Sequence, residues 1–260
     1  MKRRAMMLLT LAAAMGLCGC RKEAERSREL KVACAASLRS VMEGVVGKYG
    51  AVRPGVELRC TYGASGTLQA QAMEGAPFDV ILGADEAGPA ALAAAGVSGA
   101  PFVFGEGRLA LWVRKESGLD VEGLGLRVLL DPRVKKVAVA NPELAPYGRA
   151  AMEALGRAGI EAAVRERLVF AENVAQAAQY VASGSAQAGL LAWSLTLSPV
   201  MVAEGVAWKV PETAHEPLVH AGVVLKRTAE AEAARAFCEW LCGPEGGVVL
   251  RRGGLTPVKR

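Results

Sequence analysis

Two turns in the first third of the chain carry hydroxyl side chains where a predicted strand leads into a predicted helix. Ser37 follows the apolar run 30–36 and is placed to cap the helix that comes next. The turn 62–67 holds Ser65 and two glycines, and glycines allow a ligand to approach the backbone closely. Because open α/β sheets bind ligands at such turns, the hydroxyl and backbone N–H groups of both segments are candidate hydrogen-bond donors.

Two later turns offer backbone donors. The loop 142–148 leads into a helix near Arg149, and Asn173-Val174 opens another helix. The first N–H groups of a helix have no partner within it and carry partial positive charge, so several helix starts directed at one point bind an anion without Lys or Arg. A serine at a helix start is more often only a cap, so the four turns together carry this prediction.

The ligand that suits such a site is a small, fully deprotonated oxyanion. The first two turns hold no cation, and Arg39 is expected to lie along the surface of its helix. Donors on all sides without an acceptor fit a tetrahedral dianion, whereas hydrogen phosphate would need a carboxylate to accept its proton.

A catalytic interpretation has weaker support. The segment 63–67 partly resembles the nucleophile elbow of serine hydrolases, but Thr67 stands where the last glycine of the G-x-S-x-G pattern belongs. The available bases are His215 and His220, which lie in or beside a proline-flanked loop and are expected to be surface or packing residues. We therefore expect no enzyme activity, and a serine hydrolase using Ser65 is a distant alternative.

Two other features could suggest catalysis or nucleotide binding. Asp79 and Asp85 lie at strand ends, where they are expected to hold loop amides. The segment 105–110 is similar to a dinucleotide-binding fingerprint, but it leads into a strand rather than a helix. Neither feature changes the expectation of a binding protein without a cofactor.

The rest of the chain alternates strand and helix signals. Strand signals lie at 30–36, 56–62, 78–83, 109–113, 137–140, 188–192 and 219–225. Helical spacing of apolar residues lies at 38–49, 68–75, 88–96, 148–158, 160–167, 174–183 and 229–242. This alternation predicts an α/β fold with parallel sheets that carry helices on both faces.

The N-terminal segment predicts export. Basic residues at 2–4 precede an apolar run at 5–17 that is too short to span a bilayer stably. The run 17–20, Leu-Cys-Gly-Cys, resembles the lipobox of bacterial lipoproteins, which implies cleavage after residue 19 and a lipid anchor on Cys20. Residues 1–19 would then be the signal peptide and 20–29 a tether, while an ordinary secretory signal is the alternative.

Charge argues against a nucleic-acid partner. Three of the basic residues behind the formal charge of +5 belong to the signal, so the exported chain carries about +2. Beyond the tether at 21–28 there is no basic run. The remaining length suits one large domain or two modest lobes.

The cysteines are expected to be buried free thiols. Cys34 and Cys60 both lie in strand-like segments and could be neighbours, so a disulfide between them is an alternative that export permits. Cys238 and Cys242 share one face of a predicted helix without good bridging geometry, and no histidine lies beside them to complete a metal site.

Five ordered segments resemble those of the periplasmic molybdate-binding proteins of ABC importers. Residues 31–38 are similar to that family's A-A-A-S-L opening, and 62–68 are similar to its S-S-S-T-L turn. Further similarities lie at 77–85, 141–148 and 172–174, with a G-P-x-A-like segment at 243–245. The resemblance runs from residue 30 to the C-terminus.

The resemblance implies a two-lobed clamshell of the type II periplasmic binding proteins, each lobe a mixed, mostly parallel sheet flanked by helices. Residues 30–111 and 218–260 would form lobe 1, and 112–217 lobe 2, with a hinge near Leu109 and Val219. Such a monomer binds molybdate or tungstate between its lobes at the periplasmic side of the cell envelope. It delivers the anion to a membrane permease driven by a cytoplasmic ATPase.

The resemblance also implies the ligand donors. Ser37 and Ser65 would each give a hydroxyl and a backbone N–H, and Val174 would give a backbone N–H. Tyr147 stands where the family has an alanine that donates its N–H. Molybdenum would enter only as the oxyanion, held by these residues.

One family ligand is missing. Ala192 occupies the position of a tyrosine whose hydroxyl binds the anion, so Ser194, a water or the Tyr147 hydroxyl would have to replace it. Another tetrahedral oxyanion such as sulfate or phosphate is the alternative ligand, because the sequence does not give the cavity radius. A sensor or adaptor that uses the same fold without transport is a further alternative.

Overall fold

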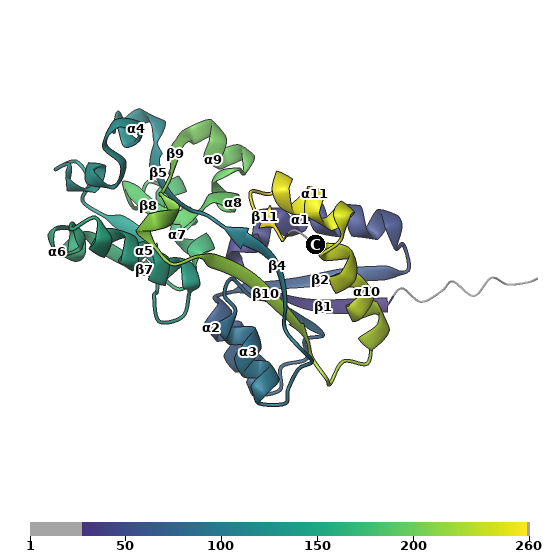
Figure 1. Cartoon of the computed structure of the whole chain (residues 1–260). Helices are drawn as coiled ribbons and strands as arrows, with labels where there is room; N and C mark the ends of the chain where they lie inside the picture. Colours follow the sequence, from purple (N-terminus) through teal and green to yellow (C-terminus); the bar gives the residue numbers. More distant parts are fainter. Residues whose placement is uncertain (1–27, 259–260) are drawn as a thin grey trace, which may run out of the picture.

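The computed structural model describes residues 28–258, which form two lobes, each built on its own sheet (Figure 1). The predicted signal peptide, the lipidation of Cys20 and most of the tether lie outside the described residues. Within residues 28–258, every helix is too short or too polar to cross a bilayer.

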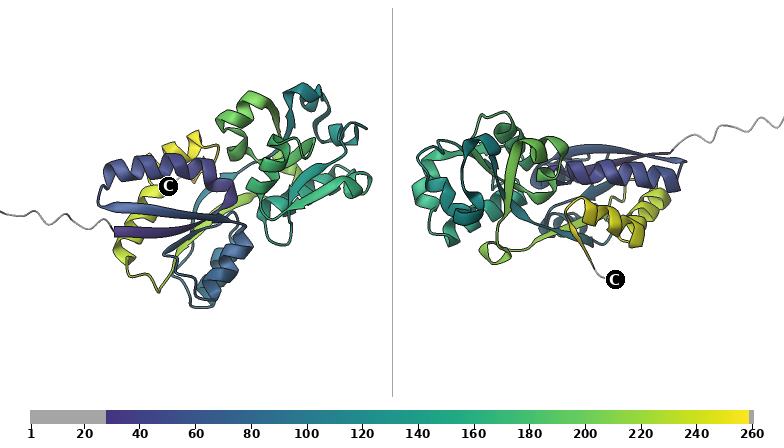
Figure 2. Two further views of the ribbon diagram at one scale, coloured as in Figure 1. Left: turned by 180° about the vertical axis from the view of Figure 1, so that it is seen from behind. Right: turned by 90° about the horizontal axis from the view of Figure 1, so that it is seen from above.

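The first sheet has six strands in the order β11-β4-β10-β3-β1-β2. Its strands are β1 (Arg28–Ala35), β2 (Val56–Gly63), β3 (Val80–Leu82), β4 (Phe102–Gly107), β10 (Leu218–Val224) and β11 (Thr256–Pro257). Its helices are η1 (Ala36–Leu38), α1 (Arg39–Val52), α2 (Ser65–Met73), α3 (Ala87–Ala94), α10 (Ala231–Leu241) and α11 (Pro244–Arg252). Helices α2 and α3 cover one face of this sheet, and α1 and α11 lie on the other (Figure 2).

The second sheet has five strands in the order β7-β6-β8-β5-β9. Its strands are β5 (Leu109–Arg114), β6 (Val137–Ala140), β7 (Leu168–Ala171), β8 (Ala188–Ala192) and β9 (Gly205–Lys209). The α-helices around it are α4 (Val121–Leu124), α5 (Pro146–Arg157), α6 (Glu161–Val164), α7 (Val174–Ala182), α8 (Trp193–Thr196) and α9 (Pro199–Glu204). Short 3₁₀ turns are η2 (Lys115–Ser117), η3 (Gly125–Leu130), η4 (Arg165–Arg167) and η5 (Glu212–Ala214).

The pairing confirms the predicted mixed, mostly parallel sheets, because most strands of each sheet run in one direction: β1, β2, β3 and β4 in the first and β6, β7, β8 and β9 in the second. Parallel pairs are confined to β3-β1-β2 in the first sheet and β7-β6-β8 in the second. Strands β4, β10 and β11 pair antiparallel in one sheet, and β5, β8 and β9 do so in the other. Four of these strands, β4, β5, β9 and β10, flank the two crossings between the lobes.

The chain crosses between the sheets twice. The first crossing is Arg108, between β4 and β5, and the second is 210–217, between β9 and β10. Because Leu109 pairs with Ala192, the second sheet begins earlier than the boundary expected after residue 111. In Figure 1, β4 and β10 run side by side towards the second lobe, and they are paired antiparallel.

One continuous apolar core joins the two lobes. It includes buried side chains from β1 and α1 of the first sheet and from β5, β6 and β8 of the second. Trp112 is fully buried in β5, and its indole N–H donates to the Met201 carbonyl at 3.1 Å. A smaller apolar cluster lies under α2 and α3.

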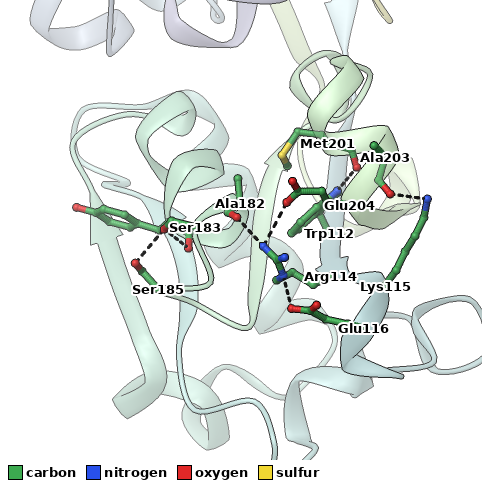
Figure 3. Close-up of polar contacts among 11 residues, drawn as sticks. Trp112, Arg114, Lys115, Glu116, Ala182, Ser183, Ser185, Met201, Ala203 and Glu204 are labelled. Atoms are coloured by element: carbon green, nitrogen blue, oxygen red, sulfur yellow. Dashed lines mark hydrogen bonds and ion pairs between the residues drawn. The ribbon is translucent and has the colours of Figure 1, made fainter.

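Polar contacts at the end of β5 hold the helices of the second lobe. The Arg114 guanidinium donates to the Ala182 carbonyl at the end of α7, at 2.7 Å (Figure 3). It also contacts Glu116 at 2.7 Å and Glu204 at 3.3 Å (Figure 3). These contacts tie the far end of α7 to the sheet, and the start of the same helix faces the first lobe.

No disulfide joins the cysteines within residues 28–258; Cys34 and Cys238 are buried, as predicted, whereas Cys60 and Cys242 are partly exposed. Cys34 and Cys60 lie on the paired strands β1 and β2, and their thiols are hydrogen-bonded to each other. Burial is the main reason that the pKa of the Cys34 thiol lies well above its usual range. Residues 28–258 hold no cluster of histidine, cysteine and carboxylate side chains that could bind a metal ion.

Candidate functional site

Four strand-to-helix turns meet at a small cavity of about 10 Å³ between the two lobes. The first lobe lines it with Ala35, Ala36, Ser37, Gly63, Ala64, Ser65 and Ala84, and the second lobe with Ala145, Pro146, Tyr147, Asn173 and Val174. The described residues that line it are all uncharged. Its volume is below the ~300 Å³ at which pockets for drug-sized molecules begin, so it suits a small solute.

Ser65 lies at the first position of α2 and is 8 % exposed. Its Oγ accepts a hydrogen bond from the Ala84 N–H, at 3.1 Å, in the loop after β3. Because this contact uses a lone pair, the hydroxyl hydrogen of Ser65 can be donated to a ligand. The backbone N–H of Ser65 is also one of the helix-start donors without a partner within the helix.

Ser37 has different surroundings, and the prediction that it caps the first helix is wrong. It lies inside the turn η1, whose N-cap is Ala35, because the chain tightens into a 3₁₀ turn before α1 begins. The Ser37 Oγ is 3.3 Å from His220 Nε2, and both residues are buried. The Ser37 carbonyl accepts a hydrogen bond from the Ser194 hydroxyl at 2.6 Å.

His220 is the residue whose role the sequence does not reveal. It lies inside β10 with no exposed surface, next to a β-bulge between His220 and Ala221. Bulges re-aim side chains, and this imidazole lies against the rings of Phe104 and Tyr147, with centroids 5.8 and 6.1 Å away. Burial lowers the pKa of His220 to about 4, so the ring is neutral at neutral pH. The feature of the sequence that points to this residue is an ionisable side chain inside an otherwise apolar strand.

The second lobe presents backbone N–H groups at two helix starts. Helix α5 begins with Pro146 and Tyr147, and α7 begins with Val174. The Asn173 side chain caps α7 by accepting from the second and third N–H groups of the helix, both at 3.1 Å. This cap leaves the Val174 N–H as a donor. The start of α5 likewise leaves the Tyr147 N–H without a partner within the helix.

The Tyr147 ring lies beneath the cavity, towards the crossing strands. It packs on His220 at an interplanar angle of 63°. A Cβ on Gly107 would overlap the Tyr147 hydroxyl and lie 2.7 Å from the His220 ring, so this crossing requires glycine. Burial raises the pKa of the Tyr147 hydroxyl, which is therefore protonated at neutral pH.

The structure brings four of the predicted ligand residues together and leaves two apart. Ser37, Ser65, Tyr147 and Val174 all line the cavity. Ala192 ends β8 with no exposed surface, and it does not line the cavity. Ser194 also stays outside the lining, because its hydroxyl is directed at the Ser37 carbonyl.

Direct contacts join the lobes around the cavity. The Gly66 N–H of the first lobe donates to the Leu144 carbonyl of the second at 2.9 Å. Arg149 on α5 forms an ion pair with Asp85 at 2.7 Å. Asp85 also accepts from the Gly88 N–H in the first turn of α3 at 3.0 Å, so it holds a helix-start amide rather than a loop amide. The arrangement is that of a clamshell with its lobes in contact.

Charged side chains near the cavity have partners outside its lining. The Arg39 guanidinium lies over the ring of Tyr62 on β2, 4.4 Å from its centroid, and Arg39 does not line the cavity. Arg108 is paired with Glu106 at 2.6 Å and with Glu212 at 2.8 Å. Charge recognition in the cavity therefore falls to hydroxyl and backbone donors.

Comparisons with known proteins agree with this geometry. Residues 30–256 match the profile of a family described as bacterial extracellular solute-binding proteins. A molybdate-binding protein ModA of Azotobacter vinelandii is 33% identical over 248 residues, which cover 95% of this chain and 96% of that protein. A ModA of Rhodobacter capsulatus is 33% identical over 75% of each chain. The solved A. vinelandii periplasmic molybdate-binding protein superposes with a TM-score of 0.82 at 31% identity, covering 88% of this chain and all of that one.

Proposed function

The chain belongs to the family of bacterial extracellular solute-binding proteins, and from this premise we propose that it binds molybdate, and tungstate with it, between its lobes. One observation carries the proposal: an uncharged cavity lined by two serines and two second-lobe helix starts. The molybdate-binding relatives that match most of the chain support the choice of anion.

The donors divide between the lobes. Ser65 gives its hydroxyl and backbone N–H, Ser37 its backbone N–H and hydroxyl, and Tyr147 and Val174 their backbone N–H groups. A tetrahedral dianion accepts hydrogen bonds at all four oxygens and has no proton to donate, so this all-donor cavity favours it over hydrogen phosphate. Helix-start dipoles add favourable charge without a cation.

The family resemblance at Ala192 leaves one donor to be replaced. Ser194 contributes indirectly, because its hydroxyl donates to the Ser37 carbonyl. This contact fixes the turn that presents the hydroxyl and backbone N–H of Ser37. The Tyr147 hydroxyl is another candidate, but its ring is buried against His220, so a different side-chain rotamer would be needed to bring it to the anion. A water is the other replacement for the missing tyrosine.

Binding is coupled to the relative position of the lobes. Only a state in which the lobes meet lets one anion contact Ser65 and Val174 together, so the anion shifts the population towards that state. The crossings at Arg108 and 210–217 act as the hinge. A membrane permease driven by an ATPase would recognise the closed form and receive the anion, with the protein held at the cell envelope through a lipid on Cys20.

Two alternatives have less support. A different oxyanion, sulfate or phosphate, would use the same donors with another cavity radius. A serine hydrolase using Ser65 lacks a base, because the Ser65 Oγ accepts from a backbone N–H while His220 lies beside Ser37 instead.

Calorimetric titration of the purified protein with molybdate, tungstate, sulfate and phosphate tests the proposal. We expect one-to-one binding of molybdate and tungstate and no heat from sulfate. Binding of sulfate or phosphate alone would move the specificity within the same fold. No binding of any of the four anions would overturn the proposal.

A further inference from the structure

One hydroxyl hydrogen in this site faces two acceptors. His220 Nδ1 lies 3.0 Å from the Leu218 carbonyl oxygen, and a carbonyl can only accept, so Nδ1 carries the hydrogen. In a neutral imidazole the other nitrogen, Nε2, is then an acceptor. It lies 3.3 Å from the Ser37 Oγ, so Ser37 donates its hydroxyl hydrogen to His220.

A bound oxyanion competes for that hydrogen. The anion is an acceptor, and Ser37 has a single hydroxyl hydrogen to donate. If Ser37 turned this hydrogen to the anion, a neutral His220 would keep a buried Nε2 without a donor, which is costly. Ser65 has no such conflict, because it accepts from the Ala84 N–H and keeps its hydrogen for the ligand.

We propose that His220 is a positioning residue that takes up one proton when the cavity binds an oxyanion. The proton comes from the solvent and adds to Nε2, so that Nε2–H donates to the Ser37 Oγ. Ser37 then gives its hydroxyl hydrogen to an oxygen of the anion. The imidazolium lies one hydrogen bond behind the dianion and supplies the positive charge that the cavity lining lacks. This inference rests on the proposed function.

The groups that face His220 from the neighbouring elements permit this change. Ser37 lies on η1, the protonated Tyr147 hydroxyl on α5 and the uncharged Phe104 ring on β4. The carboxylates that act on it are Asp85, after β3, and Glu106, on β4.

Each of these carboxylates already has a cation. Asp85 is paired with Arg149, and Glu106 with Arg108. Both carboxylates raise the pKa of His220, but desolvation outweighs them and the ring stays neutral beside an empty cavity. An added dianion with no cation of its own raises the pKa further.

The sign of the pH dependence follows from this linkage. The anion binds the protonated form more tightly, so the affinity rises as pH falls. Between the pKa of His220 in the free protein, about 4, and its higher value in the complex, the affinity should change by up to about tenfold per pH unit. Above the pKa of the complex the affinity should not depend on pH.

The test is a set of molybdate titrations between about pH 5.5 and pH 8, a range in which histidine is the side chain that ordinarily titrates. Each pH is measured in two buffers with different heats of ionisation, which gives the number of protons taken up. The chain has two histidines, so His220→Gln removes the proposed site and His215→Gln is the matched control. His215 is also buried, and its Nδ1 contacts the carbonyl of Glu216.

We expect uptake approaching one proton per molybdate at the lower pH values, in the wild type and in His215→Gln. His220→Gln should bind without proton uptake and without the rise in affinity. Nitrogen NMR of the wild-type His220 ring reports the same event directly, since Nε2 should change from an acceptor to an N–H when molybdate is added. This measurement decides the matter even if His220→Gln does not fold.

Two results would count against the inference in different ways. Molybdate binding without proton uptake, with an unchanged Nε2 resonance, would overturn the role of His220 and leave the proposed function intact. Absence of binding by all four oxyanions would overturn the proposed function, and the proton coupling with it.

Discussion

The two lobes line the same cavity with different kinds of donor. The first lobe contributes the side chains of Ser37 and Ser65, each held by a partner, His220 or the Ala84 N–H, in addition to the backbone N–H groups of both serines. The second lobe contributes backbone N–H groups of Tyr147 and Val174 at two helix starts. A side-chain donor is removed by one substitution, whereas a backbone donor is lost only when the backbone moves. The second half of the site is therefore vulnerable through packing rather than through its own side chains.

Gly148→Ala is expected to have the largest effect, because it moves the backbone of the second lobe. A Cβ at Gly148 would overlap the Ala140 carbonyl oxygen and lie 2.8 Å from the Pro142 nitrogen. Since both neighbours are backbone, the start of α5 must shift, and the Tyr147 N–H with it. We expect the free energy of unfolding to fall by about 1–3 kcal/mol and molybdate affinity to fall more than about tenfold.

Urea unfolding without ligand and calorimetric titration measure the two effects of Gly148→Ala. The matched control is Gly156→Ala in the same helix, where the nearest atom to a new Cβ is a Glu161 carboxylate oxygen at 3.4 Å. This control should keep its affinity and gain stability, because alanine favours a helix over glycine. Equal affinity in both variants would contradict the idea that α5 supplies a backbone donor.

Ser65→Ala tests the side-chain half of the site. It removes one donor to the anion and leaves the buried Ala84 N–H without its acceptor. A hydrogen bond to a charged group contributes about 1.5–3 kcal/mol, so we expect molybdate affinity to fall by roughly ten- to a hundredfold. Calorimetric titration measures this, with Thr67→Ala as a control that removes a hydroxyl from the same helix outside the cavity lining. A Ser65→Ala protein that binds as well as Thr67→Ala would exclude the Ser65 hydroxyl as a ligand donor.

Asn173→Ala separates stability from affinity in the second lobe. The side chain caps α7 through two N–H groups, and loss of such a cap costs about 0.5–2 kcal/mol of unfolding free energy. The Val174 N–H remains, so affinity should fall less than in Ser65→Ala.

The comparison variant for this cap is Asn173→Asp. Aspartate keeps the cap and its stability, but it places a carboxylate at the edge of the cavity and should weaken molybdate binding. The two variants should therefore reverse their order between urea unfolding and calorimetric titration. If both measurements rank them alike, the cap and the site are not separable.

The side-chain donors of the first lobe are the part of the site that local sequence pattern could predict. Strands β6 and β8 are continuous apolar runs, β1 is apolar after Lys31, and β2 alternates apolar and polar residues. The turns that follow β1 and β2 carry serines, so local pattern is enough to select Ser37 and Ser65. That they donate to a ligand stays a prediction. Strand β4 was missed because Gly105, Glu106 and Gly107 interrupt its apolar pattern. Helix α11 was missed because Pro244 opens it and two glycines follow.

The contacts that the sequence did not predict have one cause in common. His220 reaches Ser37 because β10 returns from the second lobe, 183 residues further along the chain. Asp85 reaches Arg149 in the same way, across the two lobes. Each residue has an ordinary local context, and only the pairing of distant strands brings it to the cavity. Local periodicity contains no information on such pairing.

Arg149→Met should have the smallest effect, because it removes a cross-lobe contact rather than a ligand donor. The Arg149 and Asp85 side chains are 44% and 22% exposed, and exposed ion pairs contribute about 0.2–1 kcal/mol. We expect molybdate affinity to fall by at most about fivefold, with less difference from wild type at high salt because the charges are screened. Titrations at low and high salt measure this, with Arg165→Met as the control, since Arg165 pairs with Glu161 within the second lobe. A loss of affinity that persists at high salt, or one that Arg165→Met shares, would show that the Arg149–Asp85 pair does not hold the lobes together.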